Sequence, residues 1–338
     1  MSNMIPARLL HLLDIQHVRY LEIYRKLYTQ LSMGAPGSVV MLVGPTRVGK
    51  SRLVCAVARA LVGETESDAT QPVIVIEAAT THGGRFSMKH FTMRALQELR
   101  HPLFGEHGHL IRRSESETQL RLQLEQAIVH RQTRYLIIDE AHHLLRTPQI
   151  QRAAEVLDSL KCLANSTGVI LVLAGAYELF TAGLASTHLN GRMRVIEFGR
   201  YQPGGQDNVH YLGILKGLDV HLPWKNGHSL LGHSQYVQAG TLGCLGLLLA
   251  WVNAAMCEMI SRGEELLCLD HFVETRFEEQ IALIAREIEA GESAMSRLRP
   301  FATKTQATFG SVDSGGTPRS RKPFQRIPKR DPVDAGRR

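Results

Sequence analysis

The chain has 338 residues, of which 44% are hydrophobic, and this is enough for a sizeable core in one large or two modest domains. No stretch reaches the ~20 apolar residues that span a bilayer, so we expect a cytosolic protein without membrane contact. The five cysteines (Cys55, Cys162, Cys244, Cys257 and Cys268) show no CxxC spacing and lie mostly among apolar residues. This pattern predicts buried free thiols in a reducing compartment.

The net charge of +7 is concentrated at the C-terminal end. Residues 297–338 hold 11 Lys and Arg against 3 Asp, whereas the preceding residues hold 28 basic and 29 acidic side chains. This tail is rich in Pro, Gly and Ser, so we expect it to be disordered when free. Two interpretations stay open: a solubility tail, or an arm that contacts nucleic acid or an acidic partner.

Hydrophobic periodicity predicts alternating helices and strands over the first 200 residues. The predicted helices are 9–31, 49–63, 86–99, 115–130 and 149–163. The predicted strands are 38–43, 72–77, 135–139, 168–173 and 194–198. Such alternation predicts the α/β class, with a five-stranded parallel sheet covered by helices on both faces.

The character of the sequence changes after residue 201. A stretch rich in Gly, Pro and His leads into two predicted helices, 242–260 and 269–289, and no strand follows. We therefore expect four segments: an N-terminal helical lead-in (1–36), an α/β core (37–200), a small helical lid domain (201–290) and the basic tail (291–338).

A glycine-rich loop follows the first predicted strand and opens a helix. Its residues 44–51, GPTRVGKS, fit the pattern GxxxxGK[ST] without a mismatch. Glycines let backbone N–H groups fold around phosphate oxygens, the lysine reaches the β- and γ-phosphates, and the hydroxyl binds Mg²⁺. A merely flexible turn is the alternative, and the strand-to-helix context argues against it. The predicted phosphate ligands are Gly44, Pro45, Thr46, Arg47, Val48, Gly49, Lys50, Ser51 and Arg52.

A second motif ends the third predicted strand at YLIIDE, residues 135–140. Asp139 is predicted to hold Mg²⁺ with Ser51, and Glu140 to polarise the attacking water. We expect this strand to lie next to the first one. His142 and His143 lack further ligands at metal spacing, so they are expected at the surface or in contact with the site residues.

Together these motifs predict a site for a nucleoside triphosphate with Mg²⁺, and ATP is the default. A guanine-reading [NT]KxD segment is not found in the expected place, which disfavours a GTPase. The fourth strand offers only Gly175 and Ala176 where a polar sensor is common, leaving Tyr177 or Glu178 as substitutes. Two arginines, Arg192 and Arg194, stand at the entrance to the fifth strand.

Across residues 9–290 the chain resembles the AAA+ transposition regulators of the TnsC/TniB type. The resemblance rests on His17 and Tyr20 in the lead-in, the GPTRVGKS loop, LIIDEAHHL, AGAYEL, NGRMRVIEFGRY, and the segment AGTLGCLGL from residue 239 followed by a helix that ends near RG at 262–263. The block ending in RY and the Gly-Thr-Leu-Gly helix start discriminate best, because many ATPases share the nucleotide motifs.

The resemblance implies an AAA+ P-loop ATPase that assembles head-to-tail on duplex DNA as a ring or filament. In that family the protein links a target-selection protein (TniQ-like) to transposase subunits, some members serve transposons guided by CRISPR complexes, and hydrolysis resets the assembly. Arg192 or Arg194 would then reach the γ-phosphate of a neighbouring subunit; surface arginines are the alternative. The apolar sensor position and a lid helix start without arginine depart from the wider AAA+ pattern and favour slow, switch-like hydrolysis.

Contacts with DNA in such an assembly require local cations, because the core is close to neutral. Candidates are Arg85, Lys89 and Arg94, which follow the second strand, and Arg112 and Arg113, which precede the helix predicted at 115–130. Solvated surface charge is the alternative for each. Two rival functions also stay open, a helicase loader or initiator-like AAA+ ATPase, and a scaffold ATPase that binds only proteins.

Overall fold

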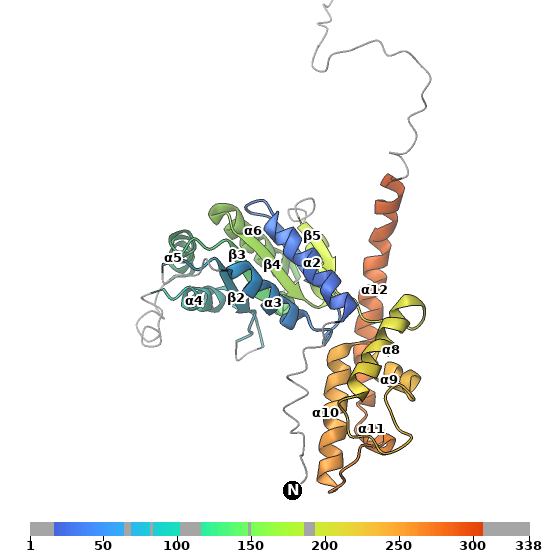
Figure 1. The fold of residues 1–338 in the computed structure, drawn as a ribbon. Coiled ribbons are helices and arrows are strands. Elements are labelled where there is room, and N and C mark those ends of the chain that lie inside the picture. The colour runs from blue at the N-terminus through green and yellow to red at the C-terminus, as the bar shows by residue number, and fades with distance from the viewer. Residues whose placement is uncertain are drawn as a thin grey trace, which may run out of the picture. The chain divides into compact units, whose positions relative to one another are not determined.

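The computed structural model describes residues 17–63, 69–81, 84–101, 116–147, 150–185 and 193–306 (Figure 1). Five parallel strands form one sheet, in the order β2-β3-β4-β1-β5. Their bounds are β1 Val39–Val43, β2 Val73–Glu77, β3 Tyr135–Asp139, β4 Ile170–Gly175 and β5 Met193–Glu197. The predicted α/β class and the five-stranded parallel sheet are confirmed.

One topological prediction is wrong: β3 does not lie next to β1. Strand β4 is inserted between them and pairs with both, so that Leu171 is in register with Val39 on one side and with Leu136 on the other. Every residue of β1 and β4 is buried. Such continuously apolar strands need a neighbour on each side and helices on each face, which places both in the interior of the sheet.

Helices cover both faces of the sheet, as predicted. Alternate residues of β1 supply the two cores, with Val40 on one side and Met41 on the other. The first side carries α2 (Val18–Ser32) and α3 (Lys50–Val62). The opposite side carries α4 (Met88–Glu98), α5 (Glu117–His130), the 3₁₀ helix η2 (Ala141–Leu145), α6 (Ile150–Thr167) and α7 (Tyr177–Ala185). The sequence did not predict α7, which directly follows β4.

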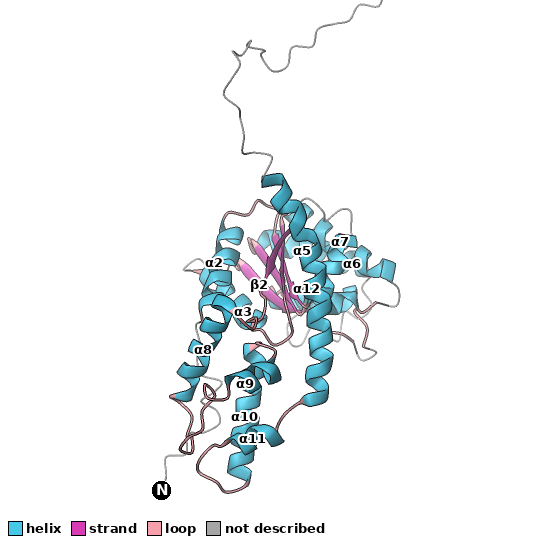
Figure 2. Ribbon diagram, turned by 90° about the vertical axis from the view of Figure 1, so that its right-hand side faces the viewer, coloured by secondary structure: helices cyan, strands magenta, loops and turns pink. Residues whose placement is uncertain are grey.

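After β5 the chain forms helices with a separate core built around Trp251 (Figure 2). They are α8 (Gly205–Asp219), α9 (Ser234–Thr241), α10 (Leu245–Ser261) and α11 (Leu269–Glu274), which we call the lid. Neither α8 nor α9 was predicted, because their glycines weakened the helical pattern. The predicted helix 269–289 is broken at Thr275, which ends α11, and a new helix α12 (Glu278–Gln306) begins. Because α12 runs to Gln306, the first residues of the segment expected to be disordered are helical.

The prediction that all the cysteines are buried is wrong for three of the five. Cys244 and Cys268 are buried, whereas Cys55, Cys162 and Cys257 are exposed. The exposed cysteines lie on the outward sides of α3, α6 and α10. All five are free thiols.

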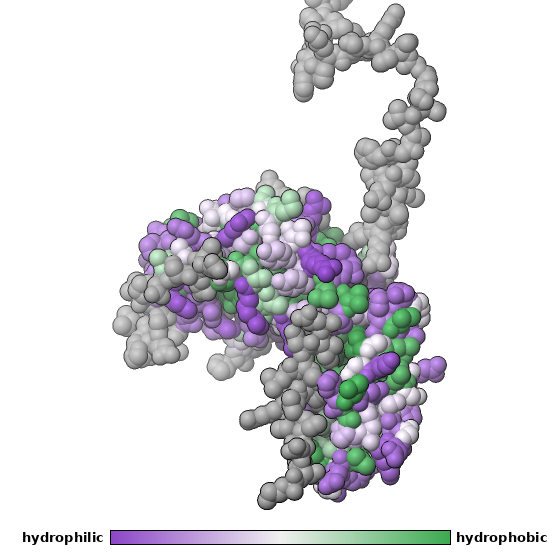
Figure 3. All heavy atoms as spheres, in the orientation of Figure 1, coloured by the Kyte–Doolittle hydropathy of each residue, from purple (hydrophilic) through white to green (hydrophobic). Residues whose placement is uncertain are grey.

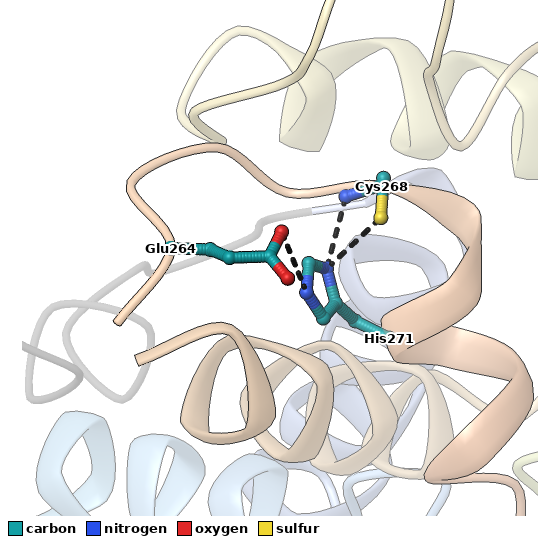
Figure 4. A group of neighbouring side chains, drawn as sticks. All are labelled: Glu264, Cys268 and His271. Carbon is teal, nitrogen blue, oxygen red and sulfur yellow. Dashed lines mark hydrogen bonds and ion pairs between the residues drawn. The ribbon is translucent and has the colours of Figure 1, made fainter. Parts of the chain in front are cut away.

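Cys268, His271 and Glu264 meet where α11 begins (Figure 4). His271 Nδ1 accepts the backbone N–H of Cys268 at 3.1 Å and lies 3.4 Å from its Sγ, while Nε2 faces Glu264 Oε2 at 3.4 Å. The thiol of Cys268 therefore lies at Nδ1 of His271, whereas the carboxylate of Glu264 lies at Nε2. Nδ1 already accepts a hydrogen bond from the backbone N–H of Cys268. We interpret the cluster as a capping box that starts α11.

No single helix among the described residues is long and apolar enough to cross a membrane. Helices α9 and α10 satisfy that length and composition only as a pair, and they bend by 112° at their junction. On the face seen in Figure 3, hydrophobic and hydrophilic residues are intermixed over the lid.

Candidate nucleotide site

The phosphate loop connects β1 to α3 and has the backbone of an anion cradle. Arg47 and Gly49 both have a positive φ, 63° and 106°, and Gly49 stands at the N-cap of α3 without a side-chain cap. The first N–H groups of α3 are therefore left for a ligand. Because the helix dipole also favours negative charge at this end, the loop is suited to phosphate oxygens.

Two glycines let the loop pack against other backbone segments. A Cβ at Gly44 would lie 2.1 Å from the carbonyl oxygen of Phe198, which follows β5. A Cβ at Gly246 in the lid would lie 2.3 Å from the carbonyl oxygen of Arg47, and the Gly246 N–H donates to that oxygen at 2.7 Å. The loop is thus held by the core on one side and by α10 on the other.

Lys50 points back into the loop that precedes it. Its Nζ donates to the carbonyl oxygens of Gly44 and Pro45, at 3.0 and 2.6 Å, and the side chain is only 7% exposed. Burial lowers the pKa of Lys50, while the negative charges of Glu140 and Asp139 act to raise it. A buried cation whose hydrogen bonds go to two neutral carbonyl oxygens can also bind an anion, so the residues present fit a bound triphosphate.

The two predicted carboxylates stand at the carboxyl end of β3, beside Lys50. Asp139 Oδ1 accepts the N–H of Glu140 at 2.9 Å, and Glu140 adopts a left-handed backbone with φ 50°. This turn directs Glu140 toward His142, whose Nδ1 lies 3.2 Å from Glu140 Oε2. Burial, with the charges of His143 and Lys50, lowers the pKa of His142 to about 4. His142 therefore contacts Glu140 as a neutral ring. Contact with a site residue was one of the two positions expected for it.

An apolar cavity of about 180 Å³ borders the phosphate loop at Val48 and Gly49. Its walls come from the start of α2, from the loop and α3, and from the lid: His17, Tyr20, Val48, Gly49, Arg52, Leu218, Leu245, Gly246, Leu248 and Leu249. Rings and aliphatic side chains beside a phosphate loop suit a flat heterocyclic base. The sequence singled out His17, Tyr20 and the segment around Gly246 only through a family resemblance, and it did not identify the leucines.

The remaining predicted nucleotide ligands have mixed environments. Ser51 and Arg52 are exposed at the start of α3, where Ser51 is open to a metal ion, and Thr46 is half-buried in the loop. The hydroxyl of Tyr177 donates to Glu197 Oε1 at 3.0 Å, at the carboxyl end of β5. Its role as a sensor stays a prediction. Arg192 lies outside the described residues.

Arg194 is exposed near the amino end of β5, in register with Val40. The phosphate loop follows the opposite end of β1, after Val43, so the structure does not bring Arg194 to Lys50 of the same chain. Strand β5 is an edge strand of the sheet, with β1 as its sheet neighbour.

The predicted DNA contacts are brought together only in part. Arg85 is exposed just before α4, and Lys89 is half-buried at the start of that helix. The segment between them contacts the end of η2, because the Phe86 N–H donates to the carbonyl oxygen of Arg146. Arg94 donates to the carbonyl oxygen of Glu77, the last residue of β2, at 3.3 Å. Arg112 and Arg113 lie outside the described residues.

Sequence reasoning gave no role at the nucleotide site to three groups from outside the core, and two of them, Cys244 and Glu287, act on the charge of Lys50. Arg200 leads from the core into the lid, Cys244 starts α10, and Glu287 lies on α12; burial raises the pKa of Cys244 to about 12. Arg200 binds Glu292 of α12 through two contacts of 2.9 and 3.0 Å. These residues are about 150 to 240 positions away from Lys50. Arg200 and Cys244 lie in segments that carry the family resemblance, but no local pattern links any of the three to the phosphate loop.

Comparison with known families agrees with this geometry. Residues 35–182 match the family model for an AAA domain. The matched segment contains the phosphate loop and both carboxylates. No curated protein sequence gives a significant match to the chain.

Solved structures are similar to this chain over about three quarters of its length. The Aeropyrum pernix ORC2 protein, in its ADP form and in its ADPNP-ADP complexes, is similar with a TM-score of 0.53 at 14% identity. The alignment covers 76% of this chain and 66% of that one. Drosophila ORC bound to DNA aligns with a TM-score of 0.49 at 16% identity, over 76% of this chain and 58% of that one. The ORC2 structures therefore share the fold of this chain.

Proposed function

We propose that the protein binds ATP with Mg²⁺ and hydrolyses it slowly. One observation carries this proposal: Lys50, Asp139 and Glu140 lie close together at the phosphate loop, and the same loop borders an apolar cavity. The cavity takes the base, the loop amides and Lys50 take the phosphates, and Ser51 with Asp139 hold Mg²⁺, which neutralises phosphate charge when bound. Glu140 orients and polarises the water.

A binding titration with Lys50→Ala tests the proposal. We expect at least a hundredfold loss of affinity for a fluorescent ATP analogue, because the variant loses the buried cation that faces the phosphates. Lys216→Ala, which removes an exposed lysine of α8, is the matched control and should bind like the wild type. Equal binding by the wild type and the Lys50 variant would contradict the proposed site.

We further propose that ATP acts as an assembly ligand in a regulator of DNA transposition. The γ-phosphate held by one subunit would be reached by Arg192 or Arg194 of the next, so that part of the binding energy stabilises the oligomer. The position of Arg194 supports this: it is exposed and at the opposite end of the sheet from its own Lys50. Duplex DNA, a TniQ-like target-selection protein and transposase subunits are the proposed partners, and they rest on the family resemblance.

Glu140→Gln separates assembly from reset. The variant should still bind ATP and assemble on duplex DNA, and it should stay assembled after free ATP is removed, because hydrolysis is blocked. Light scattering or electron microscopy after a nucleotide wash would measure the lifetime of the assembly. Disassembly as fast as that of the wild type would mean that hydrolysis is not the reset.

An initiator-like AAA+ ATPase is the second candidate, favoured by the likeness of the fold to the ORC2 protein. Gel shifts on duplex and single-stranded DNA, with and without a non-hydrolysable ATP analogue, distinguish the candidates. Nucleotide-dependent assembly on duplex DNA supports the transposition regulator, and a preference for single strands supports a helicase loader or initiator. A protein that binds neither DNA would be a scaffold ATPase.

A further inference from the structure

His17 contributes a buried polar side chain to the wall of the apolar cavity. On the lid side that wall consists of leucines from α8 and α10, such as Leu218 and Leu248. Tyr20 and Arg52 also line the cavity, but Tyr20 is half-buried and Arg52 is exposed, whereas His17 is only 8% exposed. Because a buried polar atom without a hydrogen-bond partner costs free energy, each ring nitrogen of His17 needs a partner.

Neighbouring protein groups determine which nitrogen of this ring carries the proton. The backbone N–H of Tyr20 lies 3.2 Å from Nδ1 of His17, and a backbone N–H can only donate. Nδ1 is therefore the accepting nitrogen. The hydroxyl of Tyr201, 2.6 Å from Nδ1, then donates to it as well, and the hydroxyl oxygen accepts the N–H of Arg19 at 3.4 Å. This hydrogen-bond network assigns the proton of the neutral ring to Nε2.

Nε2 is thus the polar atom that His17 can offer to a ligand. Burial, with the charge of Arg19, lowers the pKa of His17 to about 4, so the ring is neutral near pH 7 and Nε2–H is a donor. Among the residues that the structure describes, no group accepts a hydrogen bond from it. The ring is held in place, because Tyr201 packs against it edge-on with the ring centroids 5.5 Å apart. A donor fixed in this way is preorganised for an acceptor in the cavity.

The size and polarity of the cavity favour a base that presents ring acceptors. At about 180 Å³ it is smaller than the roughly 300–1,000 Å³ of pockets that enclose whole drug-sized ligands, so it suits a base rather than a complete nucleotide. The ring nitrogens N1, N3 and N7 of adenine are all acceptors, whereas N1 of guanine carries a proton. Guanine therefore brings an additional donor, which leucine side chains cannot pair, and a buried unpaired donor costs affinity.

We propose that Nε2–H of His17 donates to a ring nitrogen of adenine and makes the site selective for ATP over GTP. This inference rests on the proposed nucleotide site. His17 touches the base, while Tyr20 and Tyr201 orient the donor from behind, one at the start of α2 and the other where the chain leads into the lid. The specificity for the base is thus determined at the junction, outside the consecutive motif that binds the phosphates.

Nucleotide analogues test this in the full-length wild type. The compounds 1-deaza-, 3-deaza- and 7-deaza-ATP each replace one ring nitrogen of adenine by a C–H group that accepts no hydrogen bond. With Mg²⁺ present, we expect one of the three to bind about tenfold more weakly than ATP and the other two to bind within about twofold of it. GTP should bind at least about tenfold more weakly than ATP. Competition against a ribose-labelled fluorescent ATP analogue gives the affinities.

The substitution His17→Phe identifies the donor. It keeps a flat ring at the cavity but removes Nε2–H, so ATP should bind about tenfold more weakly, and the sensitive deaza analogue should bind as well as ATP does. His130→Phe makes the same substitution at an exposed position at the end of α5 and is the matched control. It should retain the pattern of the wild type.

The outcomes separate the inference from the function beneath it. A wild type that binds ATP and all three deaza analogues equally would overturn the inference while the nucleotide site stands, and equal affinity for GTP would overturn the selectivity. If His17→Phe still distinguished the sensitive analogue from ATP, another group would be the donor and the inference would be wrong. A wild type that binds no nucleotide overturns the proposed function as well. The wild-type comparison needs no variant, so it can overturn the inference even where His17→Phe fails to fold.

Discussion

The phosphate loop and the junction between core and lid meet at the same lysine, yet they are specified in different ways. The loop is eight consecutive residues whose glycines, lysine and serine each have a local reason. The junction is a set of long-range contacts, such as Arg200 with Glu292, 92 residues apart, and Gly246 with Arg47. The residues proposed to bind the phosphates come from a contiguous motif. The contacts between distant residues determine how the lid responds to the bound nucleotide.

The largest expected effect comes from a change that joins the two regions. In Gly246→Ala the new methyl group would lie 2.3 Å from the carbonyl oxygen of Arg47, so the start of α10 and the phosphate loop must separate. We expect a loss of about 3 kcal/mol in the free energy of unfolding, typical of overpacking against backbone. Nucleotide affinity should fall as well, because the loop and one wall of the apolar cavity move together.

Urea unfolding and a nucleotide titration on the same preparation check both halves of this prediction. A variant that loses stability but binds ATP like the wild type would show that the lid contact is only structural. The junction between core and lid would then have no effect on nucleotide binding by the loop.

The next effect concerns His17, which ties the start of α2 to the junction. Its Nδ1 lies 2.6 Å from the hydroxyl of Tyr201 and accepts the N–H of Tyr20 at 3.2 Å. Burial, helped by the charge of Arg19, lowers the pKa of His17 from 6.5 to about 4. The folded state therefore keeps His17 neutral where the unfolded chain takes up a proton, and stability is lost as the pH falls from 6.5 toward 4.

Between pH 7 and pH 5 this loss should be about 2 kcal/mol for His17 alone. His17→Gln should remove that share of the pH dependence, and His130→Gln, at an exposed position at the end of α5, should keep it. Denaturant unfolding at several pH values gives the slopes. An unchanged slope in His17→Gln would mean that the histidine is not held neutral at the junction.

The core was predictable because its signals are short-range. Short apolar runs with β-branched residues, such as that of β3, predict buried strands, so the five strands and the α/β class followed from the sequence. The phosphate loop fits its motif residue by residue. The order of the strands did not follow, since β4 gives no local sign that it will pair with both β1 and β3. Element ends were also displaced, as in β4, which runs two residues beyond its predicted end.

The site was predictable as far as its ligands are consecutive. Lys50, Asp139 and Glu140 were identified by motif and lie together in the structure. Leu218, Leu248 and Glu287 were not identified, and Arg200 was given no role at the site, because each becomes relevant only when the lid and α12 fold onto the core. Predicted contacts that depend on another molecule, such as Arg194 or Arg85, stay predictions.

The smallest expected effect uses the same substitution as the largest and should have the opposite sign. Gly213 lies in the middle of α8, and a Cβ there would meet nothing within 4 Å. Gly213→Ala should therefore raise the free energy of unfolding by about 0.5–1 kcal/mol, because alanine loses less backbone entropy in a helix. The helix was missed in the sequence on account of glycines that the structure does not require, whereas Gly246 is required by a neighbouring carbonyl. If Gly213→Ala destabilised the protein in the same urea titration, the two kinds of glycine would not differ, and the contrast between local propensity and long-range packing would fail at its simplest test.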